Sequence, residues 1–332
     1  MDEAGSPITI SQAIQRYLES VKNARSQNTG RTYANGMALF RSMLVAHQLP
    51  PDQTPLSQMD EEAVAWFAAS LKNNAPTTER LYLTAAAGLY EFVAAEDLAK
   101  INLPRVRLLI HQRARRPGIR LPQFPKNAIE SLIEKAIHLT QKSAEDDKER
   151  LRNLRDRAFM ITLADTGLRV HEACRLRRGD IDWFEGKAVI IGKGDREAVV
   201  RFSERSLKAL KDYLTGRAKL DGASGRQLSS LPLFARHDPG AGKKVKPITT
   251  ATGRNIVTER VREFLGEDAV GTITPHSFRH YFVTTVLNAS GNLKLAQELA
   301  RHQNIAVTQR YAHLNDDELD KGYGEIFNPD RK

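Results

Sequence analysis

Six side chains far apart in the sequence carry groups that together suit chemistry at a phosphodiester. They are two arginines, one lysine, two histidines and one tyrosine: Arg169, Lys193, His276, Arg279, His302 and Tyr311. Attack on a phosphodiester builds negative charge on the non-bridging oxygens, which guanidiniums bind through paired N–H donors. A tyrosine oxygen can act as the nucleophile, a lysine can protonate the leaving alkoxide, and imidazoles can transfer protons. The set therefore indicates phosphoryl transfer promoted by cations.

We predict no metal and no cofactor, because the sequence shows no acidic cluster suited to two-metal phosphate chemistry. One alternative is a metal-dependent nuclease, since His276 and His280 are spaced i, i+4 and His302 could join them. The neighbouring arginines would repel such a cation, which favours a packing role for His280. Activity that survives a chelator would distinguish the two interpretations.

The sequence around the second arginine predicts the start of a helix. Thr274 is a suitable N-cap and Pro275 a suitable first helical residue. His276 and Arg279 are then one turn apart on one face. They lie where free backbone N–H groups and the helix dipole favour an anion.

The other groups stand at predicted ends of elements. Arg169 comes just after a helix that ends at Gly167, a natural C-cap residue. Lys193 lies in a glycine-flanked turn between two short β-type runs, which indicates a hairpin. His302 ends a predicted helix, and Tyr311 lies on or beside the last one.

The pattern of helices, prolines and charge predicts two domains. Residues 8–103 show four helical apolar patterns with short connections, which predicts a small bundle. Residues 104–125 contain four prolines and no apolar period, which predicts an extended basic linker. Residues 126–315 are helical except for the hairpin, and residues 316–332 form an acidic tail. The predicted fold class is mainly α with a small antiparallel β-sheet.

The basic charge is concentrated in the middle of the chain. The 332 residues carry a formal charge of +10. Residues 1–100 and 315–332 each carry a net charge of −3, so residues 101–314 carry +16. Residues 104–124 hold six arginines and no acid. This distribution predicts a basic surface and an anionic partner, most often nucleic acid.

Several protein classes do not fit the composition. The single cysteine excludes a disulfide framework and any multi-cysteine metal site. There is no apolar run near the roughly 20 residues that a membrane span needs, and the acidic N-terminus does not resemble a signal peptide. We therefore expect a cytoplasmic, nucleoid-associated protein with no membrane partner.

The ordered set of motifs resembles the tyrosine recombinases, also called the phage integrase family. Three motifs carry the resemblance: Thr166-Gly-Leu-Arg-Val-His-Glu172, His276-x-x-Arg279, and Ala300-Arg-His302 followed by Thr308 and Tyr311-x-His313. The intervals from Arg279 to His302 and from His302 to Tyr311 are usual for the family. Three residues differ from those that are commoner in the family at these positions. Arg301 stands where glycine is frequent, and His171 and Ala173 flank Glu172 in place of commoner residues.

The resemblance covers about residues 8–320 and implies the domain roles. Residues 8–103 would be a helical core-binding, SAM-like, DNA-binding domain, and residues 126–315 a mixed α/β catalytic domain. The chain resembles the simple-site recombinases of the Xer and Cre type, which lack an arm-binding domain. The tail 316–332 would be a helix that docks on a neighbouring protomer in trans, although packing in cis is an open alternative.

The resemblance also implies a mechanism. Tyr311 would attack the scissile DNA phosphate to give a 3′-phosphotyrosyl link, and a hydroxyl of another strand would rejoin the DNA without ATP. Two such rounds would pass through a Holliday junction. Arg169, Arg279 and His302 would hold the phosphate, Lys193 would be the general acid, and His276 would transfer a proton. Glu172 and, more weakly, His313 would support them.

The implied partner is double-stranded DNA with specific recombination sites, bound by a homotetramer that is a monomer or weak oligomer when free. Basic residues of the first domain, the linker and the stretch 216–247 would contact the DNA: Arg25, Arg31, Arg41, Arg105, Arg107, Arg113, Arg115, Arg116, Lys243 and Lys244. Most such contacts are made to backbone phosphates and fix the position of the protein along the DNA. DNA binding should therefore weaken steeply as the salt concentration rises.

Other interpretations remain open. The chain could be a catalytically silent DNA-binding protein of the same fold, or resemble a type IB topoisomerase or telomere resolvase. Lys187 competes with Lys193 for the lysine role, although it precedes the apolar strand. The sequence leaves the target site open, and with it the choice among integration of a mobile element, dimer resolution and transposon resolution.

Overall fold

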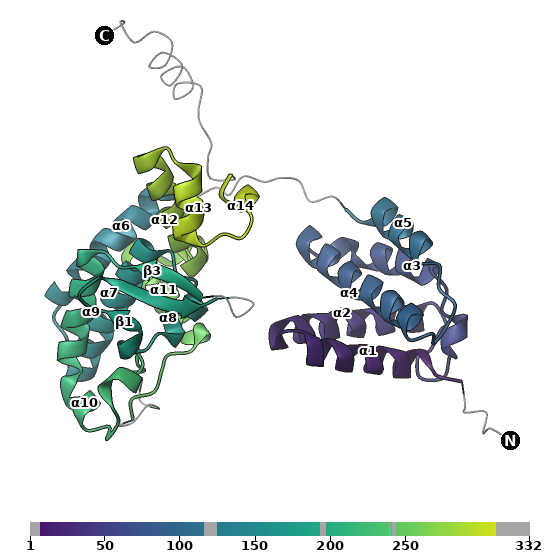
Figure 1. Cartoon of the computed structure of the whole chain (residues 1–332), viewed down its shortest axis with the longest axis horizontal. Helices are drawn as coiled ribbons and strands as arrows, with labels where there is room; N and C mark the ends of the chain where they lie inside the picture. Colours follow the sequence, from purple (N-terminus) through teal and green to yellow (C-terminus); the bar gives the residue numbers. More distant parts are fainter. Residues whose placement is uncertain (1–6, 116–124, 193–196, 239, 241–243, 310–332) are drawn as a thin grey trace, which may run out of the picture. The chain divides into compact units, whose positions relative to one another are not determined.

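A computed structural model describes residues 7–115, 125–192, 197–238, 240 and 244–309. The chain divides into two compact units, Met1–Arg120 and Leu121–Lys332 (Figure 1). Both units are mainly helical, and the strands form one small antiparallel sheet in the second unit. The predicted fold class is therefore confirmed. None of the described helices is long and apolar enough to cross a membrane.

The first unit is a helical bundle with two short 3-10 turns. Its helices are α1 (Ile10–Ala24), α2 (Gln27–Ala46), α3 (Glu62–Ser70), α4 (Pro76–Ala95) and α5 (Leu103–Arg113), and its 3-10 turns are η1 (Leu56–Gln58) and η2 (Leu71–Asn73). The first helix begins with a capping box, in which Thr9 and Gln12 are hydrogen-bonded reciprocally. The buried core includes an edge-to-face pair of Phe40 and Phe67, whose ring centroids are 5.1 Å apart.

The prediction of an extended linker from residue 104 is wrong at its start, because residues 103–113 form α5. The Asn102 side chain caps this helix by accepting a hydrogen bond from the Arg105 backbone N–H, 3.0 Å away. Pro104 lies in the first turn, where its missing N–H costs nothing. Val106 is fully buried, and Leu103 and Ile110, three and four residues away on the same side of the helix, pack partly buried against the core. It packs against α3 and α4 and belongs to the first unit.

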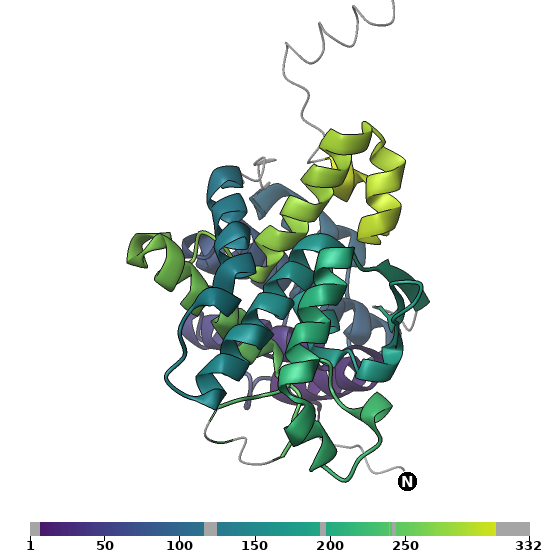
Figure 2. The same cartoon turned by 90° about the vertical axis from the view of Figure 1, so that its left-hand side faces the viewer.

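The second unit consists of helices around the long α7, with the sheet at one edge. Its α-helices are α6 (Lys126–Ile137), α7 (Asp147–Thr166), α8 (Val170–Arg175), α9 (Glu204–Gly216), α10 (Ala218–Gly222), α11 (Thr250–Leu265), α12 (Pro275–Ser290), α13 (Leu293–Ala300) and α14 (Ile305–Gln309). Its 3-10 turns are η3 (His138–Gln141), η4 (Arg178–Asp180), η5 (Leu228–Ser230) and η7 (Glu267–Ala269). Helix α7 lies between α6 and α9 and is buried along most of its length (Figure 2).

The sheet has the order β1 (Ile181–Asp182), β2 (Lys187–Ile191) and β3 (Glu197–Arg201), with all neighbours antiparallel. The predicted hairpin is confirmed, since Ile191 pairs with Glu197 across the turn. Residues along β2 alternate between exposed and buried, as expected for a sheet with one face on the core.

Candidate active site

Arg169 is held at the start of α8 by a single buried carboxylate. Helix α7 ends at Gly167, whose φ of 58° is a left-handed conformation that favours glycine. Glu172, in the first turn of α8, accepts one hydrogen bond from the Arg169 backbone N–H and one from its Nη1, each 2.8 Å long. The Glu172 side chain is 2% exposed, whereas that of Arg169 is 42% exposed. The carboxylate therefore orients a guanidinium that still faces solvent.

Gly167 is needed for a second reason, which is the close approach of α12. A Cβ atom at this position would lie 2.5 Å from the ring of Phe282. The backbone of the turn thus packs directly against the helix that carries Arg279. A side chain at residue 167 would force the Phe282 ring of α12 to move and would strain the left-handed backbone.

Arg279 is buried and crosses between two backbone turns. Its side chain starts from α12, whose first turn is capped as predicted, with the Thr274 backbone N–H donating to Ser277 Oγ at 3.0 Å. Arg279 Nη1 donates to the Gly167 carbonyl at 2.6 Å, and Nη2 donates to the Ala300 carbonyl. One guanidinium therefore joins the turn before Arg169 to the turn before His302.

His302 follows α13, and its ring is fixed by Thr308 of α14. The Nδ1 atom lies 2.8 Å from Thr308 Oγ1, and the His302 carbonyl accepts a hydrogen bond from Gln297 Nε2 at 3.0 Å. Burial, followed by the charges of Arg279 and Arg169, lowers the pKa of His302 to about 4. The imidazole is therefore neutral at pH 7 and would gain affinity for a proton when an anion binds beside it.

His276 and His280 pack against each other on α12. Their ring centroids are 4.5 Å apart in an edge-to-face arrangement. Partial burial, with the charges of Arg279 and Arg169, lowers the pKa of His276; burial and His276 lower that of His280 to about 4. Across the described ranges, no three His, Cys, Asp or Glu side chains come together as metal ligands, so the nuclease alternative finds no cluster there.

Positive charge dominates this cluster. Burial alone would raise the pKa of Glu172, but the hydrogen bonds from Arg169 and the charge of Arg301 outweigh it and lower the pKa. Glu172 is thus a carboxylate at neutral pH. The cluster therefore contains one carboxylate and three guanidiniums, those of Arg169, Arg279 and Arg301. Such an excess of cations around one exposed guanidinium suits an anion with more than one acceptor oxygen.

Several predicted residues lie outside the described residues: Lys193, Tyr311, His313, Arg116 and Lys243. The two strands that flank the Lys193 turn are described, and β2 begins with the competing lysine. Lys187 Nζ donates to Glu185 at 2.9 Å on the exposed side of the strand. The roles of the nucleophile and the general acid therefore remain predictions.

Most of the described arginines predicted to contact DNA in the first unit are paired with carboxylates. Arg41 pairs with Asp52 at 2.8 Å, and Arg107 pairs with Glu91 at 3.0 Å. Arg105 reaches two glutamates, Glu61 at 3.4 Å and Glu62 at 3.2 Å. Arg25, Arg31, Arg113 and, in the second unit, Lys244 are exposed at the surface.

Arg115 anchors the end of the first unit. Its Nε donates to Glu79 Oε2 at 2.5 Å, and its Nη2 donates to the Asn74 carbonyl. Lys72 Nζ pairs with the same glutamate at 2.9 Å, and the Glu79 side chain is 1% exposed. A buried carboxylate needs such partners, so Arg115 stabilises the bundle at the point where the chain leaves α5.

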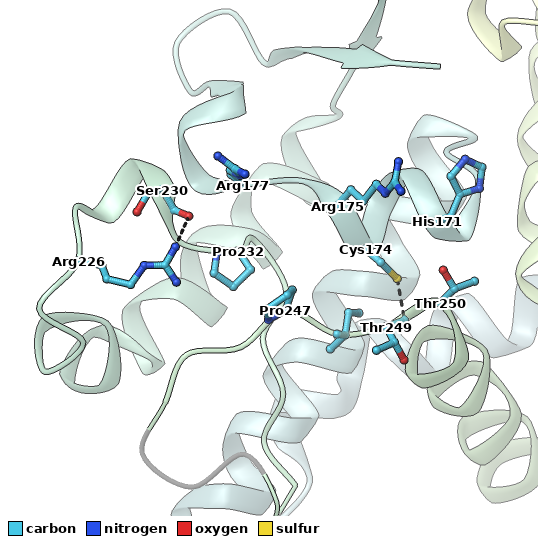
Figure 3. Close-up of a pocket in the computed structure, with 11 residues that line it drawn as sticks. His171, Cys174, Arg175, Arg177, Arg226, Ser230, Pro232, Pro247, Thr249 and Thr250 are labelled. Carbon is cyan, nitrogen blue, oxygen red and sulfur yellow. Dashed lines mark hydrogen bonds between the residues drawn. The ribbon is translucent and has the colours of Figure 1, made fainter. Parts of the chain in front are cut away.

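A basic cavity of about 370 Å³ in the second unit was not predicted (Figure 3). Figure 3 shows Arg226 and Ser230 on one side and His171 and Thr250 on the other. Arg175 and Arg177 line it as well, and Thr249, the N-cap of α11, lies at its edge. The signal in the sequence was the run Arg175-Leu-Arg-Arg178 just after the first arginine motif.

Comparisons with known proteins agree with this geometry. The model of the phage integrase family matches residues 130–318. The tyrosine recombinase XerC of Pediococcus pentosaceus is 27% identical over 316 residues, covering 95% of this chain and 96% of the relative. XerC of Thermodesulfovibrio yellowstonii is 29% identical over 305 residues, covering 91% of each chain.

Solved structures show the same fold. The XerH recombinase bound to a palindromic difH substrate, in a post-cleavage complex, matches with a TM-score of 0.68 at 20% identity, covering 95% of this chain and 84% of that one. The Tn1549 transposon integrase with transposon right end DNA matches with a TM-score of 0.66 at 18% identity, covering 96% and 99%. The family match covers more than half of the chain, and this protein therefore belongs to the phage integrase family, the tyrosine-type site-specific recombinases.

Proposed function

We propose that this protein recombines double-stranded DNA at specific sites, with Tyr311 forming a 3′-phosphotyrosyl link. The observation that carries the proposal is the convergence of three segments on one anion-binding cluster. Arg279 bonds the carbonyls of Gly167 and Ala300, which precede Arg169 and His302 by two residues each. This arrangement supports one phosphate seat built by α8, α12 and the α13–α14 turn.

The residues of the cluster would share the work as follows. Arg169 and Arg279 bind the non-bridging oxygens as charge builds on them during attack. His302, neutral before binding, donates to or accepts from a phosphate oxygen. His276 moves a proton and Lys193 protonates the leaving 5′-oxygen. The released hydroxyl, or one from a second strand, reverses the reaction, so the energy of the bond is kept in the enzyme link.

The domain roles are part of the proposal. Residues 8–103 would be the core-binding domain, to which α5 is added because it packs there. Residues 126–315 would be the catalytic domain. The XerH and Tn1549 proteins are recombinases seen with DNA, which supports a DNA partner for this chain.

Backbone phosphates would be bound outside the cluster as well. Arg25, Arg31, Arg113 and Lys244 are exposed, and so are Arg175, Arg177 and Arg226 of the basic cavity. These contacts add affinity without reading sequence, because guanidinium and ammonium groups bind any phosphate. A tetramer on a Holliday junction, with residues 316–332 docked in trans, completes the proposal.

Recombination between two sites tests the function directly. The DNA site would first be recovered by selection of bound duplexes from the host genome, and two copies would then be placed in direct repeat on a plasmid. We expect excision of the intervening segment without ATP or metal. Relaxation of supercoils without exchange would instead indicate a topoisomerase, and binding without either product a silent DNA-binding protein.

A further inference from the structure

Arg301 is an unusual residue at the centre of the cluster. It follows α13 with φ 58° and ψ 45°, a left-handed backbone conformation that residues other than glycine rarely adopt. Its side chain is only 10% exposed, and its Nε makes no hydrogen bond to any described residue. A buried, positively charged residue in a disfavoured conformation persists only where its surroundings hold it there.

The guanidinium of Arg301 spans from its own turn to the segment that carries Arg169. Nη1 donates to the carbonyls of Thr166 and Leu299, each 3.3 Å away. Nη2 donates to the Gly167 carbonyl at 3.2 Å and to Glu172 Oε2 at 3.4 Å. Arg301 thus bonds the same carbonyl as Arg279 and the same carboxylate as Arg169.

The backbone around Arg301 also sets the direction of His302. The Arg301 N–H donates to the Glu298 carbonyl and the His302 N–H donates to the Gln297 carbonyl, each at 3.0 Å. This pair of bonds is the usual left-handed end of a helix, in which the first residue after it fixes the path of the next. The backbone turn at residue 301 therefore sets the path of the chain into His302, and the Arg301 side chain ties this turn to the Arg169 segment.

We propose that Arg301 is a positioning residue, which locks the His302 turn to the Arg169 turn so that both side chains face one phosphate. It also gives Glu172 a second cation, so the carboxylate stays paired while the Arg169 guanidinium turns to an anion. The inference deepens the proposed function, since it assumes that the cluster binds phosphate.

The readout is the titration of His302 in the full-length protein. Its imidazole faces Arg279 and His276 from α12, Arg169 from the α7–α8 turn, and Arg301 beside it. With nitrogen-15-labelled histidine, its ring signal is the one of nine that is lost in His302→Gln. Inorganic phosphate serves as the probe of the seat, followed on the same signal.

Arg301→Gly removes the side chain and relaxes the backbone, whereas Arg301→Lys keeps the charge without the guanidinium fork. We expect the pKa of His302 to rise toward the 6.5 of an ordinary imidazole in Arg301→Gly, and phosphate affinity to fall about tenfold. Arg301→Lys should restore the pKa in part but not the affinity. A His302 pKa or a phosphate affinity unchanged in Arg301→Gly would overturn the proposal.

A matched control separates positioning from relief of the backbone. Gln48 follows α2 with φ 61° and ends that helix with the same pair of backbone bonds. Gln48→Gly should leave the His302 pKa and phosphate affinity unchanged. Failure of the wild-type protein to bind phosphate at His302 would count against the proposed function, while the His302 pKa would still decide the role of Arg301.

Discussion

Two surface arginines of the first unit and two buried arginines of the candidate active-site cluster are held by different acceptors. Arg41 and Arg107 pair with carboxylates on the surface, so each pair is close to neutral. Arg279 and Arg301 donate mainly to backbone carbonyls, which orient a guanidinium without cancelling its charge. The cluster therefore keeps a net positive charge, and the single buried carboxylate, Glu172, is shared. The guanidiniums of Arg279 and Arg301 are thus fixed mainly by carbonyl dipoles, whereas those of Arg41 and Arg107 are balanced by carboxylates.

The largest effect is expected at Arg279. Arg279→Ala would remove one charge from the phosphate seat. It would also take this donor away from the buried Ala300 carbonyl and leave the Gly167 carbonyl with Arg301 alone. Cleavage of a nicked DNA site should slow by at least about 100-fold, and stability should fall by about 1–3 kcal/mol. Single-turnover cleavage and urea unfolding measure the two losses. A cleavage rate within threefold or so of wild type would show that the carbonyl-held cation does not act on the phosphate.

The shared carboxylate gives the next prediction. Glu172→Gln keeps the shape but loses the charge that aligns Arg169, so cleavage should slow by about 10- to 100-fold through misplacement of the guanidinium. The matched control is Glu91→Gln, which neutralises the exposed partner of Arg107. Equal effects of the two substitutions would remove the distinction between the buried and the surface carboxylate.

The surface cations are distinguished by the salt dependence of DNA binding. Arg31→Ala should lower the slope of log affinity against log salt by about one, because an exposed cation that meets a phosphate releases a counterion. Arg107→Ala should change the slope less, since Glu91 already balances this arginine. A larger change of this slope for Arg107→Ala than for Arg31→Ala would contradict the expectation that carboxylate-paired arginines contribute less to DNA binding.

The smallest effect is expected in the pH dependence of stability. The pKa of His302 is lowered to about 4, below its value near 6.5 in the unfolded chain. Between these values the unfolded state binds the proton more readily, so stability is full above pH 6.5 and falls as pH drops toward 4. Urea unfolding should show a shallower fall in His302→Gln. An unchanged slope would mean that His302 is not buried among cations.

The sequence predicted the motif-bearing elements well because their signals are local. The Thr274-Pro275 helix start, the Gly167 stop and the hairpin each depend on a few neighbouring residues, and all three appear in the structure. Helix α5 was missed because Pro104 begins a stretch of four prolines that resembles a linker, although Leu103, Val106 and Ile110 are spaced as on one helix face. The apolar signal of this helix is only three residues long and lies among arginines, so the contacts with α3 and α4 are what establish it.

The contacts among the site residues could not be predicted in the same way. Arg279 and Arg301 meet the Gly167 carbonyl across more than a hundred residues of sequence, and no spacing rule indicates a side chain bound to a distant carbonyl. Likewise, charge counting could not tell that Arg41 and Arg107 are paired while Arg31 is exposed. Composition predicts a basic surface, but only the fold shows which cations remain available.

Trapping of the covalent intermediate shows whether Tyr311 attacks DNA held by this cluster. A duplex carrying the selected site, with a nick that lets the cleaved fragment diffuse away, would be incubated with the full-length protein and resolved under denaturing conditions. We expect a covalent protein–DNA adduct for wild type and none for Tyr311→Phe, with equal DNA affinity. An adduct that persists in Tyr311→Phe, or its absence in wild type bound to this site, would contradict this expectation.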